Sequence, residues 1–518
     1  RFCPREAAGA QLQPGMATAE GTARLLRRAV ERGALHPLNV RGLPLASRGP
    51  ASAPVAGQQP SQLSVAAVGF GAYRVGGGDK EPSHLAALRS ALRVGVNLID
   101  TSSHYSAGEK GSGSSHGASE RLVGQAIAEA IAEGDVDRDG LVVCTKLGHA
   151  ELGKPAPPGA VPIRPEGQGA NQDVWHSIHP EFVDAEVRAS RERLGTPPDF
   201  VLLHNPEYFL SAQMQQRVPI GEAWDEMYER LGQSFEALEA LCDEGVISSG
   251  YGVSGNFLSC MFSTTGRGNL YESLALDRLV DVAAAAAARR GKEGGHRFRI
   301  AQLPLNAVEA GAVLGRGGAV PEAAEGDCVL GTRLGLGIVA NRPLNALPLP
   351  GVSTGDWGRQ GATHWQLRDK TPMGAVESLL KRVLLEALQA EGGVLEGDAS
   401  KIPLQHLALK LSLSSPGVSS TLCGMRAEAY VEDAAAVLKQ APFSAVQVCP
   451  CLNRRALRCP ALGLCRACAG PVVAVGWLPS SHGSKRRCRW CALPLRSWAA
   501  RSAACGETVE GVLAPFVA

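Results

Sequence analysis

Eight short apolar runs, nearly all followed by a stretch of helical periodicity, most constrain how this chain of 518 residues can fold. Gly, Pro or Asn turn residues bound each run, and the length of the runs predicts strands. The runs are Val65–Phe70, Val96–Ile99, Leu141–Thr145, Phe200–Leu203, Ile247–Val253, Phe298–Leu305, Gly337–Ala340 and Val418–Leu422. Strand and helix alternating in this way predict an α/β fold, the (β/α)8 TIM barrel.

The stretches of helical periodicity separate the predicted strands. They are His84–Val94, Ser119–Ala132, Pro180–Leu194, Glu222–Glu244, Tyr271–Arg290, Pro403–Ser414 and Ala427–Leu438. The interval Val313–Leu334 is broken by glycines and shows no clear helix. Three long insertions, Ala107–His116, His149–Ser177 and Pro348–Ala399, lengthen the loops, and the last contains a further helical run, Ala375–Leu388. Loops that follow barrel strands form the mouth of the barrel, so we expect the last two insertions to shape access to it.

Charge divides the chain into three parts. Residues 1–60 carry a balance of +5 and residues 443–518 a balance of +8, which leaves −11 for residues 61–442 in a chain of net charge +2. An acidic body argues against nucleic acid as a partner. No apolar run approaches the roughly 20 residues of a membrane span, so we expect no membrane partner either.

Residues 1–60 are predicted to be a leader outside the fold, and residues 61–442 the barrel. The leader is rich in Ala, Arg, Gly and Pro and poor in acids, and Arg27, Arg28 and Arg32 flank apolar residues, as in organelle transit peptides. An unprocessed leader is the alternative. The predicted location is therefore the cytoplasm, or a plastid or mitochondrion if the leader is a transit peptide.

Residues 443–518 form a tail that holds eight of the fourteen cysteines. Cys465, Cys468, Cys488 and Cys491 make two Cys-x2-Cys pairs whose separation falls within the range of structural zinc sites. The tail shows no periodicity and is rich in Arg, Ala, Pro and Trp, as translated non-coding sequence would be. We expect an extension without a fold, with a structural zinc site as the alternative.

Four chemically active side chains fall at or just after the ends of three successive predicted strands. Asp100 follows Val96–Ile99, Tyr105 comes five residues later, Lys146 closes the next strand, and His204 ends the one after that. Catalytic groups of β/α barrels collect at the carboxyl ends of the strands. A nearby ammonium lowers the pKa of a phenol, so a catalytic Tyr105 would need a lysine beside it, and Lys146 is the candidate. Each residue alone has an ordinary structural explanation, but together they predict an active site.

The order of short motifs from about Leu63 to Lys439 resembles the aldo/keto reductases. The motifs are Val68-Gly69-Phe70-Gly71, Ile99-Asp100-Thr101 with Tyr105, Gly117-Ala118-Ser119-Glu120 with Gly124, Thr145-Lys146, Leu203-His204-Asn205-Pro206, Gly250-Tyr251-Gly252-Val253-Ser254, Gln302 with Asn306 and Glu309, Arg342-Pro343-Leu344, and Gly417-Val418-Ser419-Ser420 through Gly424-Met425-Arg426. No single motif is specific, but the ordered set is.

The resemblance implies NAD(P)H-dependent transfer of hydride between nicotinamide and the carbon of a carbonyl or alcohol substrate. Tyr105 would be the general acid, Lys146 would lower the pKa of Tyr105, and Asp100 would hold Lys146. His204 would orient the carbonyl and share the proton-donating role. The partner would be a small carbonyl compound or a sugar-type substrate. No metal is required, because hydrogen bonds would stabilise the developing alkoxide.

The resemblance also implies a set of cofactor-binding residues. They are Ser254, Asn256, Gln302, Arg342 and Leu344 near the nicotinamide, and Gly424, Arg426, Tyr430 and Asp433 near the adenosine half. Gly255 displaces Asn256 by one place, and Asn341 stands where an aromatic residue often stacks on the ring. Tyr430 replaces an arginine that many relatives use for the 2′-phosphate, and Arg426 could substitute for it. NADP(H) is favoured, with NAD(H) as the alternative.

These departures leave a second function open. A protein of the same fold could bind the cofactor as a regulatory or scaffold subunit with little turnover, as ion-channel β-subunits of this superfamily do. The intact set of Asp100, Tyr105, Lys146 and His204 favours the enzyme. Two other histidines, His149 and His176, belong to an insertion and carry no predicted role.

Overall fold

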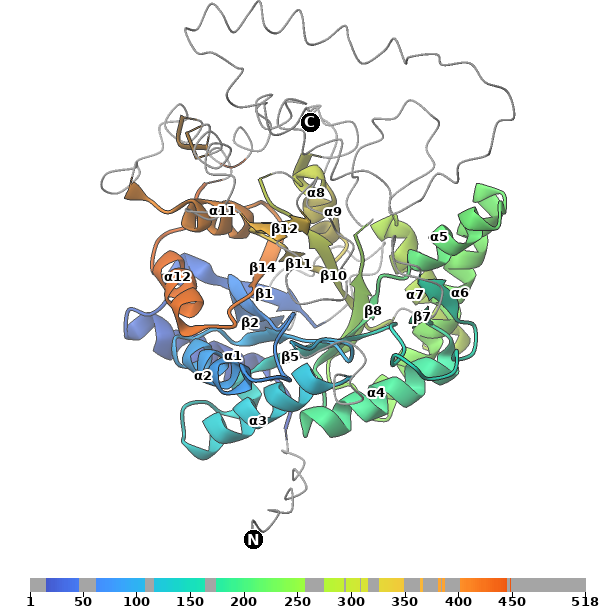
Figure 1. The fold of residues 1–518 in the computed structure, drawn as a ribbon, viewed down its shortest axis with the longest axis horizontal. Helices are drawn as coiled ribbons and strands as arrows, with labels where there is room; N and C mark the ends of the chain where they lie inside the picture. Colours follow the sequence, from blue (N-terminus) through green and yellow to red (C-terminus); the bar gives the residue numbers. More distant parts are fainter. Residues whose placement is uncertain are drawn as a thin grey trace, which may run out of the picture.

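Eight parallel strands close into a barrel, as predicted, in a computed structural model of the chain (Figure 1). The structure describes residues 15–45, 62–107, 116–163, 174–256, 274–292, 295–307, 309–314, 326–348, 364–366, 381–382, 384–386, 401–444 and 448. The barrel strands are β3 (Val68–Gly71), β4 (Leu98–Asp100), β5 (Val142–Leu147), β8 (Phe200–His204), β9 (Gly250–Ser254), β10 (Phe298–Pro304), β11 (Gly337–Asn341) and β14 (Val418–Cys423). Pairing of β14 with β3 closes the barrel, with Thr421 opposite Val68.

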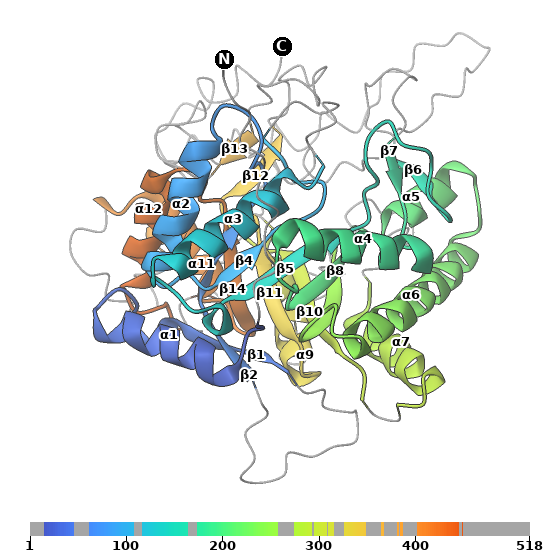
Figure 2. The ribbon, with the colours of Figure 1, turned by 90° about the horizontal axis from the view of Figure 1, so that it is seen from below.

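Helices surround the barrel, as Figure 2 shows for its lower side. They are α2 (Glu81–Arg93), α3 (Ala118–Ala132), α4 (Pro180–Leu194), α5 (Tyr208–Gln215), α6 (Ile220–Asp243), α7 (Leu276–Arg289), α11 (Leu404–Leu413) and α12 (Glu428–Leu438). Each of the seven predicted helices is present.

The interval Val313–Leu334, in which we predicted no clear helix, contains the end of one short helix and the whole of another. They are α8 (Gly311–Leu314) and α9 (Asp327–Arg333). Gly331 lies inside α9, where a Cβ atom would come within 2.3 Å of Ile338 Cδ1. The prediction was wrong because this glycine allows a helix to pack closely on β11, and does not break it.

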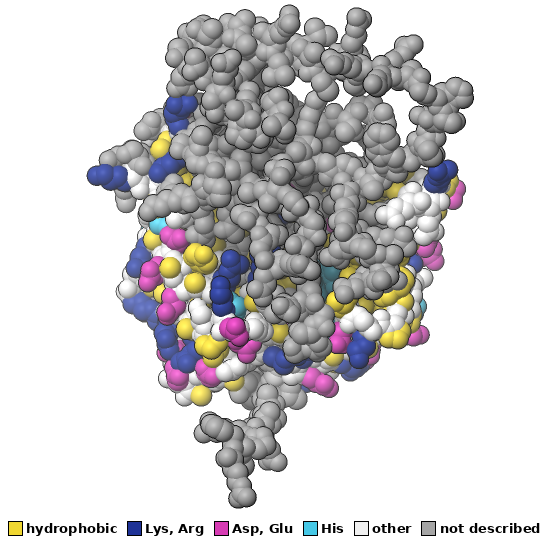
Figure 3. Space-filling view, viewed as in Figure 1, with side chains coloured by type: hydrophobic (Ala, Val, Ile, Leu, Met, Phe, Trp, Pro, Cys, Tyr) yellow, Lys and Arg dark blue, Asp and Glu magenta, His cyan; other side chains and the backbone are white. Residues whose placement is uncertain are grey.

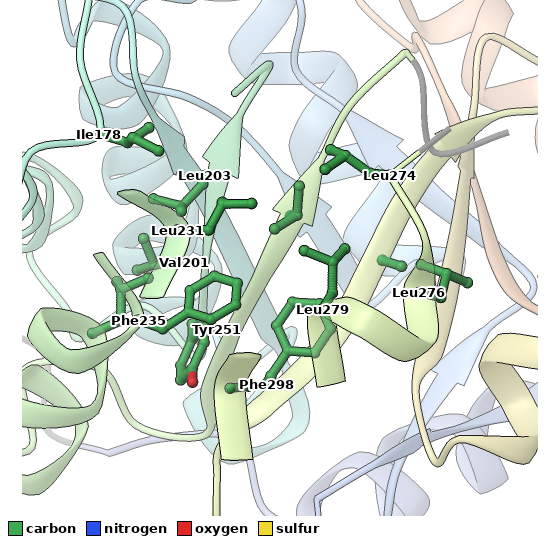
Figure 4. Packing of buried hydrophobic residues seen from close by; sticks show 14 of the residues in the cluster. Ile178, Val201, Leu203, Leu231, Phe235, Tyr251, Leu274, Leu276, Leu279 and Phe298 are labelled. Atoms are coloured by element: carbon green, nitrogen blue, oxygen red, sulfur yellow. The ribbon is translucent and has the colours of Figure 1, made fainter. Parts of the chain in front are cut away.

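Apolar side chains between the strands and the outer helices form the core. Figure 4 shows one part, in which Phe235 of α6, Tyr251 of β9 and Phe298 of β10 pack with ring centroids 5.2–5.9 Å apart. The buried hydroxyl of Tyr251 donates a hydrogen bond to Glu239 Oε1 at 3.0 Å. The aromatic packing fixes α6 against the barrel wall, and the hydrogen bond to Glu239 satisfies the Tyr251 hydroxyl that this packing buries.

Residues 15–45, which we expected outside the fold, close the bottom of the barrel. They form helix α1 (Ala19–Glu31), a short 3-10 turn, η1 (Pro37–Asn39), and strand β1 (Val40–Pro44), which pairs with β2 (Gln62–Ala66) in an antiparallel hairpin. Leu43 is fully buried inside the barrel. A Cβ atom on Gly337, at the start of β11, would lie 2.4 Å from Leu43 Cδ2. The predicted strand Val65–Phe70 is therefore two strands, β2 and β3, divided at Ala67.

Polar contacts fasten this N-terminal segment to distant parts of the chain. Thr18 caps α1 by accepting a hydrogen bond from Gly21 N at 2.9 Å. The backbone N–H of Ala17 donates to Asp199 Oδ1 at 2.8 Å. Asn39 Nδ2 donates to the carbonyl oxygens of Leu438 and Gln440, at 2.8 and 2.9 Å. An Arg-rich amphipathic helix is common to transit peptides and to surface helices, which is why the pattern misled.

The insertions supply two small hairpins. Strands β6 (Val161–Ile163) and β7 (Val174–His176) lie in the second insertion, and β12 (Asn345–Pro348) and β13 (His364–Gln366) lie around the start of the third. Residues 108–115, most of 349–400 and the tail cysteines Cys465, Cys468, Cys488 and Cys491 lie outside the described residues. Of the predicted run Ala375–Leu388 the structure describes residues 381–382 and 384–386, which are helical.

The described surface mixes acidic and basic side chains, which alternate over the lower body in Figure 3. None of the described helices combines the length and the apolar character that crossing a membrane requires.

Candidate active site

The carboxyl ends of β4, β5 and β8 bring the four predicted catalytic side chains into one place. Asp100 is the last residue of β4, Lys146 lies near the end of β5, and His204 is the last residue of β8. Tyr105 follows on the loop after β4, whose turn is closed by a hydrogen bond from Tyr105 N to Ser102 O at 3.1 Å. The carboxyl ends of parallel strands lie on the same side of a barrel. Side chains at the ends of β4, β5 and β8 are therefore brought together by the order of the strands.

Lys146 connects the group. Its ammonium donates to Asp100 Oδ1 in a very short contact, to the carbonyl oxygen of Thr101 at 3.1 Å, and to Tyr105 Oη at 3.3 Å. The ring of His204 lies edge-on to that of Tyr105, with 5.8 Å between centroids. One cation thus touches both the acid and the phenol, and the imidazole stands beside the phenol.

Burial controls the protonation of the pair. Burial by itself lowers the pKa of Lys146, but the charge and hydrogen bond of Asp100, together with Tyr105 and Cys144, outweigh it and raise the pKa above the ordinary value. Burial also raises the pKa of Tyr105 to about 12, with Lys146 opposing the rise. Lys146 lowers the Tyr105 pKa, as predicted, but the loss of solvent around the phenol has the larger effect and raises the pKa overall. The phenol therefore stays protonated at neutral pH, as a proton donor must be.

His204 is a neutral imidazole. Burial, then the neighbouring His149 and Lys146, hold its pKa well below the usual value. Its Nδ1 is buried with no hydrogen-bond partner among the described residues. A neutral ring of this kind can donate one hydrogen bond to a carbonyl oxygen without carrying a charge.

A second hydrogen-bonded chain, which the sequence did not reveal, holds Asp100 from the other side. Gln302 Nε2 donates to Asp100 Oδ2 at 2.8 Å. Gln302 Oε1 accepts from Ser254 Oγ at 2.8 Å and from Asn341 Nδ2 at 3.3 Å. The ends of β9, β10 and β11 are therefore linked to the acid that holds Lys146.

The remaining residues predicted near the nicotinamide surround a buried acid, Glu207. The backbone N–H of Asn256 donates to Glu207 Oε1 at 2.8 Å, and Asn256 Oδ1 accepts from Arg342 Nη2 at 3.2 Å. Arg342 also pairs with Glu309 at 3.1 Å, and Leu344 is buried. Burial raises the pKa of Glu207. Glu207 was missed because nothing in its local sequence distinguishes it from a surface acid at the start of α5.

The donors and acceptors at this end of the barrel fit a nicotinamide carboxamide. Asn341 Oδ1, Arg342 Nε and Glu207 Oε2 are buried without hydrogen-bond partners among the described residues. A carboxamide carries an N–H2 donor and a carbonyl acceptor, so it can satisfy both kinds of orphaned atom.

The residues predicted for the adenosine half lie together around β14 and α12. Gly424 and Arg426 are exposed, and a Cβ atom on Gly424 would meet nothing within 4 Å. Tyr430 is half-buried against the core, and Asp433 Oδ1 is paired with His406 Nε2 at 2.8 Å. An exposed guanidinium beside open space fits a phosphate group, whereas Asp433 already has a partner.

Residues 67–261 match the model of the aldo/keto reductase family, a range that contains Asp100, Tyr105, Lys146 and His204. This segment, but not the chain as a whole, is thus similar to the aldo/keto reductase family. Proteins of that family are oxidoreductases, and a match to it implies NAD(P)H-dependent carbonyl reduction. Among curated proteins, none matches the chain.

Several solved structures are distantly similar to this chain. An aldo-keto reductase from Bacillus halodurans in its holo form is 17% identical, with a TM-score of 0.42, and the match covers 76% of this chain and 93% of that one. The glycerol dehydrogenase from Gluconobacter oxydans is 18% identical, with a TM-score of 0.45 and coverages of 87% and 100%. An aldo/keto reductase from Klebsiella pneumoniae in complex with NADP and acetate is 18% identical, with a TM-score of 0.40 and coverages of 75% and 91%.

Proposed function

We propose that this chain catalyses the NADPH-dependent reduction of a small carbonyl or sugar-type substrate, and the reverse oxidation of the alcohol, with Tyr105 as general acid and base. The observation that supports it most is the position of Lys146 Nζ, which bridges Asp100 and Tyr105 Oη in a buried site. NADP(H) is the favoured cofactor, and NAD(H) is the alternative.

In reduction, the phenolic O–H of Tyr105 gives its proton to the carbonyl oxygen as that oxygen gains negative charge. The reduced nicotinamide, when bound, supplies the hydride. The ammonium of Lys146 stabilises the phenolate that remains, and Asp100 keeps the ammonium in position. Neutral His204 orients the carbonyl oxygen by donating a ring N–H. In oxidation the same phenolate accepts the proton of the alcohol.

Ser254, Asn256, Gln302, Arg342 and Leu344 would hold the nicotinamide side of the cofactor. The support is the set of unpaired amide, guanidinium and carboxylate atoms at the ends of β8 and β11.

Gly424, Arg426, Tyr430 and Asp433 would hold the adenosine side. We expect Arg426→Ala to raise KM for NADPH more than KM for NADH, because only NADPH carries the 2′-phosphate. Equal effects on both would contradict the assignment of Arg426 to that phosphate.

The decisive experiment follows NADPH absorbance with a panel of aldehydes and NAD reduction with sugars. Replacing Tyr105 by Phe removes the proton donor, so we expect turnover to fall by roughly 10²–10⁴-fold. Tyr73→Phe is the matched control, because Tyr73 packs against the Tyr105 ring at 5.2 Å but is exposed. If the wild type binds cofactor yet turns over no faster than Tyr105→Phe, the regulatory or scaffold function replaces the enzyme.

A further inference from the structure

Three histidines converge beside Tyr105 at the carboxyl end of the barrel. They are His104, His149 and His204, and each offers a ring nitrogen within 4.8 Å of the others. Among the described residues, no other group of three His, Cys, Asp or Glu side chains comes together in this way. Their positions follow from the chain order, since His104 directly precedes Tyr105 and His149 follows Lys146 by three residues.

The three rings face one another closely. His104 and His149 are stacked with 3.9 Å between centroids, and His204 lies 5.0 Å from His104 and 5.1 Å from His149. His204 is buried, whereas His104 and His149 are half-buried. Zinc binds imidazole nitrogen at about 2.0–2.1 Å, so three ligands stand roughly 3.4 Å apart around it. The nitrogens lie within 4.8 Å of one another, so binding an ion would require them to approach by up to about 1.4 Å.

The hydrogen bonds around the group determine which ring nitrogens carry a lone pair that an ion could bind. Ser102 Oγ donates to the carbonyl of Lys146 at 3.0 Å, so its oxygen accepts from His104 Nδ1 at 2.9 Å. The proton then lies on Nδ1 of His104, and Nε2 carries the lone pair. Metal-binding histidines characteristically donate their second ring N–H in this manner. Nδ1 of buried His204 has no hydrogen-bond partner in the part of the chain that the structure describes, so either tautomer of this ring is possible and one ring nitrogen can offer a lone pair to the ion.

A fourth histidine supports the loop that carries the cluster. His176 Nε2 donates to the carbonyl of His204 at 2.6 Å, and its ring lies 5.5 Å from that of His149. Gly148 has φ of 148°, and a Cβ atom there would come within 2.6 Å of His176 Nε2. A glycine at this position therefore allows the chain to bring His149 back over the end of β8.

We propose that His104, His149 and His204 form a binding site for a divalent transition-metal ion of the Zn²⁺ type, and that the bound ion inhibits the enzyme. Three neutral imidazoles suit Zn²⁺, Co²⁺ and Ni²⁺, and they leave a position for water. The charge of nearby Lys146 is balanced by Asp100. An ion on His204 withdraws that ring from the substrate and stands in front of Tyr105. The inhibition rests on the proposed function, whereas the binding of the ion does not.

The first arm of the test measures binding without turnover. EDTA-treated full-length protein is titrated with Co²⁺, followed by its visible ligand-field absorption, and with Zn²⁺ by calorimetry. We expect the wild type to bind one ion more than the variant His104→Gln/His149→Gln, which also corrects for any metal bound by the tail cysteines. His116→Gln, which changes a half-buried histidine outside the cluster, should bind like the wild type. Ser102→Ala should weaken binding by roughly 10–100-fold, because the partner of His104 Nδ1 is lost.

The second arm measures inhibition. Zn²⁺ should reduce the initial rate of the wild type, and EDTA should restore it. The variant His149→Gln should require a Zn²⁺ concentration at least about 10-fold higher for the same inhibition. Equal metal binding by the wild type and the double variant would overturn the site. Binding without loss of rate would overturn the inhibitory role. Absence of turnover in the metal-free wild type would contradict the proposed function, and the first arm would still decide whether the site exists.

Discussion

The buried pair of Lys146 and Asp100 matters for stability, and in the proposed mechanism it also positions the general acid. Lys146 is 0% exposed, and every hydrogen of its ammonium has a partner. Removing two charges from water costs several kcal/mol per ion, which the contact between them offsets only while both are present. The pair is therefore sensitive to single substitutions in a way that a surface ion pair is not.

Lys146→Met is expected to destabilise the fold by about 3–5 kcal/mol, because Asp100 is left as an uncompensated buried charge. The double variant Asp100→Asn/Lys146→Met should recover most of that stability, yet stay inactive since Tyr105 lacks its cation. Urea unfolding and the NADPH assay measure the two effects separately. A double variant no more stable than Lys146→Met would show that the pair does not behave as a coupled unit.

His296 makes stability depend on pH. It is 3% exposed, and burial, followed by the charge of Arg299, lowers its pKa to about 4. The unfolded chain, with a pKa near 6.5, binds more protons between these values, so stability falls as pH decreases from about 6.5 to about 4. At pH 5 the contribution is a loss of about 2 kcal/mol relative to pH 7.5.

Urea midpoints at pH 5 and pH 7.5, for the wild type and for His296→Gln, check this assignment. The variant should lose less stability on acidification than the wild type. The same loss in both would mean that His296 is not the responsible group.

Part of the candidate site could be predicted from the positions of its residues along the sequence. The order of Asp100, Tyr105, Lys146 and His204 along the chain was sufficient to group them, because strand ends in a parallel barrel meet. The contact of Gln302 with Asp100 joins residues 202 positions apart and leaves no local pattern. The direction of the Tyr105 pKa shift depends on how deeply the phenol is buried, which no spacing reveals.

At the scale of elements, Asp199 fastens the start of β8 to its surroundings. It pairs with buried Arg138 at 3.0 Å, accepts from Val143 N on β5 and Ser248 Oγ at 2.8 and 2.7 Å, and receives Ala17 N from the N-terminal segment. Four segments of the chain therefore meet at one carboxylate. These contacts lie at the end of the barrel where strands begin, so they support stability and not chemistry.

Asp199→Asn should destabilise the protein by about 3–5 kcal/mol, because Arg138 is left buried without its counter-charge. The activity of the fraction that remains folded should be unchanged at low temperature. Asp225→Asn is the matched control, since that carboxylate is 79% exposed in its pair with Arg278 and should change stability by about 1 kcal/mol or less. Similar midpoints for the two variants would contradict the role of Asp199.

Elements were predictable where burial leaves a continuous apolar run. All eight barrel strands fall within or beside such runs, because parallel strands are covered on both faces. Hairpin β6–β7 was not foreseen, since its strands are three residues each and lie in a Pro- and Gly-rich insertion. Helix α9 was missed because a glycine that permits close packing looks, in sequence, the same as one that ends a helix.

For the whole molecule, closure of the barrel floor depends on residues that precede the family match. Leu43 fills the interior beneath β11, and Leu26 and Ala29 pack into the core beside α2 and α3. Composition alone could not show this, because an Arg-rich helix with one apolar stripe suits a transit peptide and a surface helix equally.

Leu43→Ala is expected to cost about 2–5 kcal/mol, because it leaves a cavity inside the barrel. Leu38→Ala, in a residue that is 60% exposed, should change stability by no more than about 0.5 kcal/mol. Chemical denaturation of both variants measures the difference. If Leu43→Ala were as stable as Leu38→Ala, residues 15–45 would not belong to the stable core.

The hydrogen bonds of Asn39 have a consequence for how the protein is made. Its side-chain amide binds carbonyls 399 and 401 residues further along the chain. A ribosome that adds about 5–20 residues per second needs roughly 20–80 s to reach them. During that interval Leu26 and Leu43 have left the exit tunnel without the strands and helices that will cover them. This segment is synthesised well before the last elements that hold it in place, and a nascent chain of this protein should engage chaperones around Leu26 and Leu43 until translation passes α12.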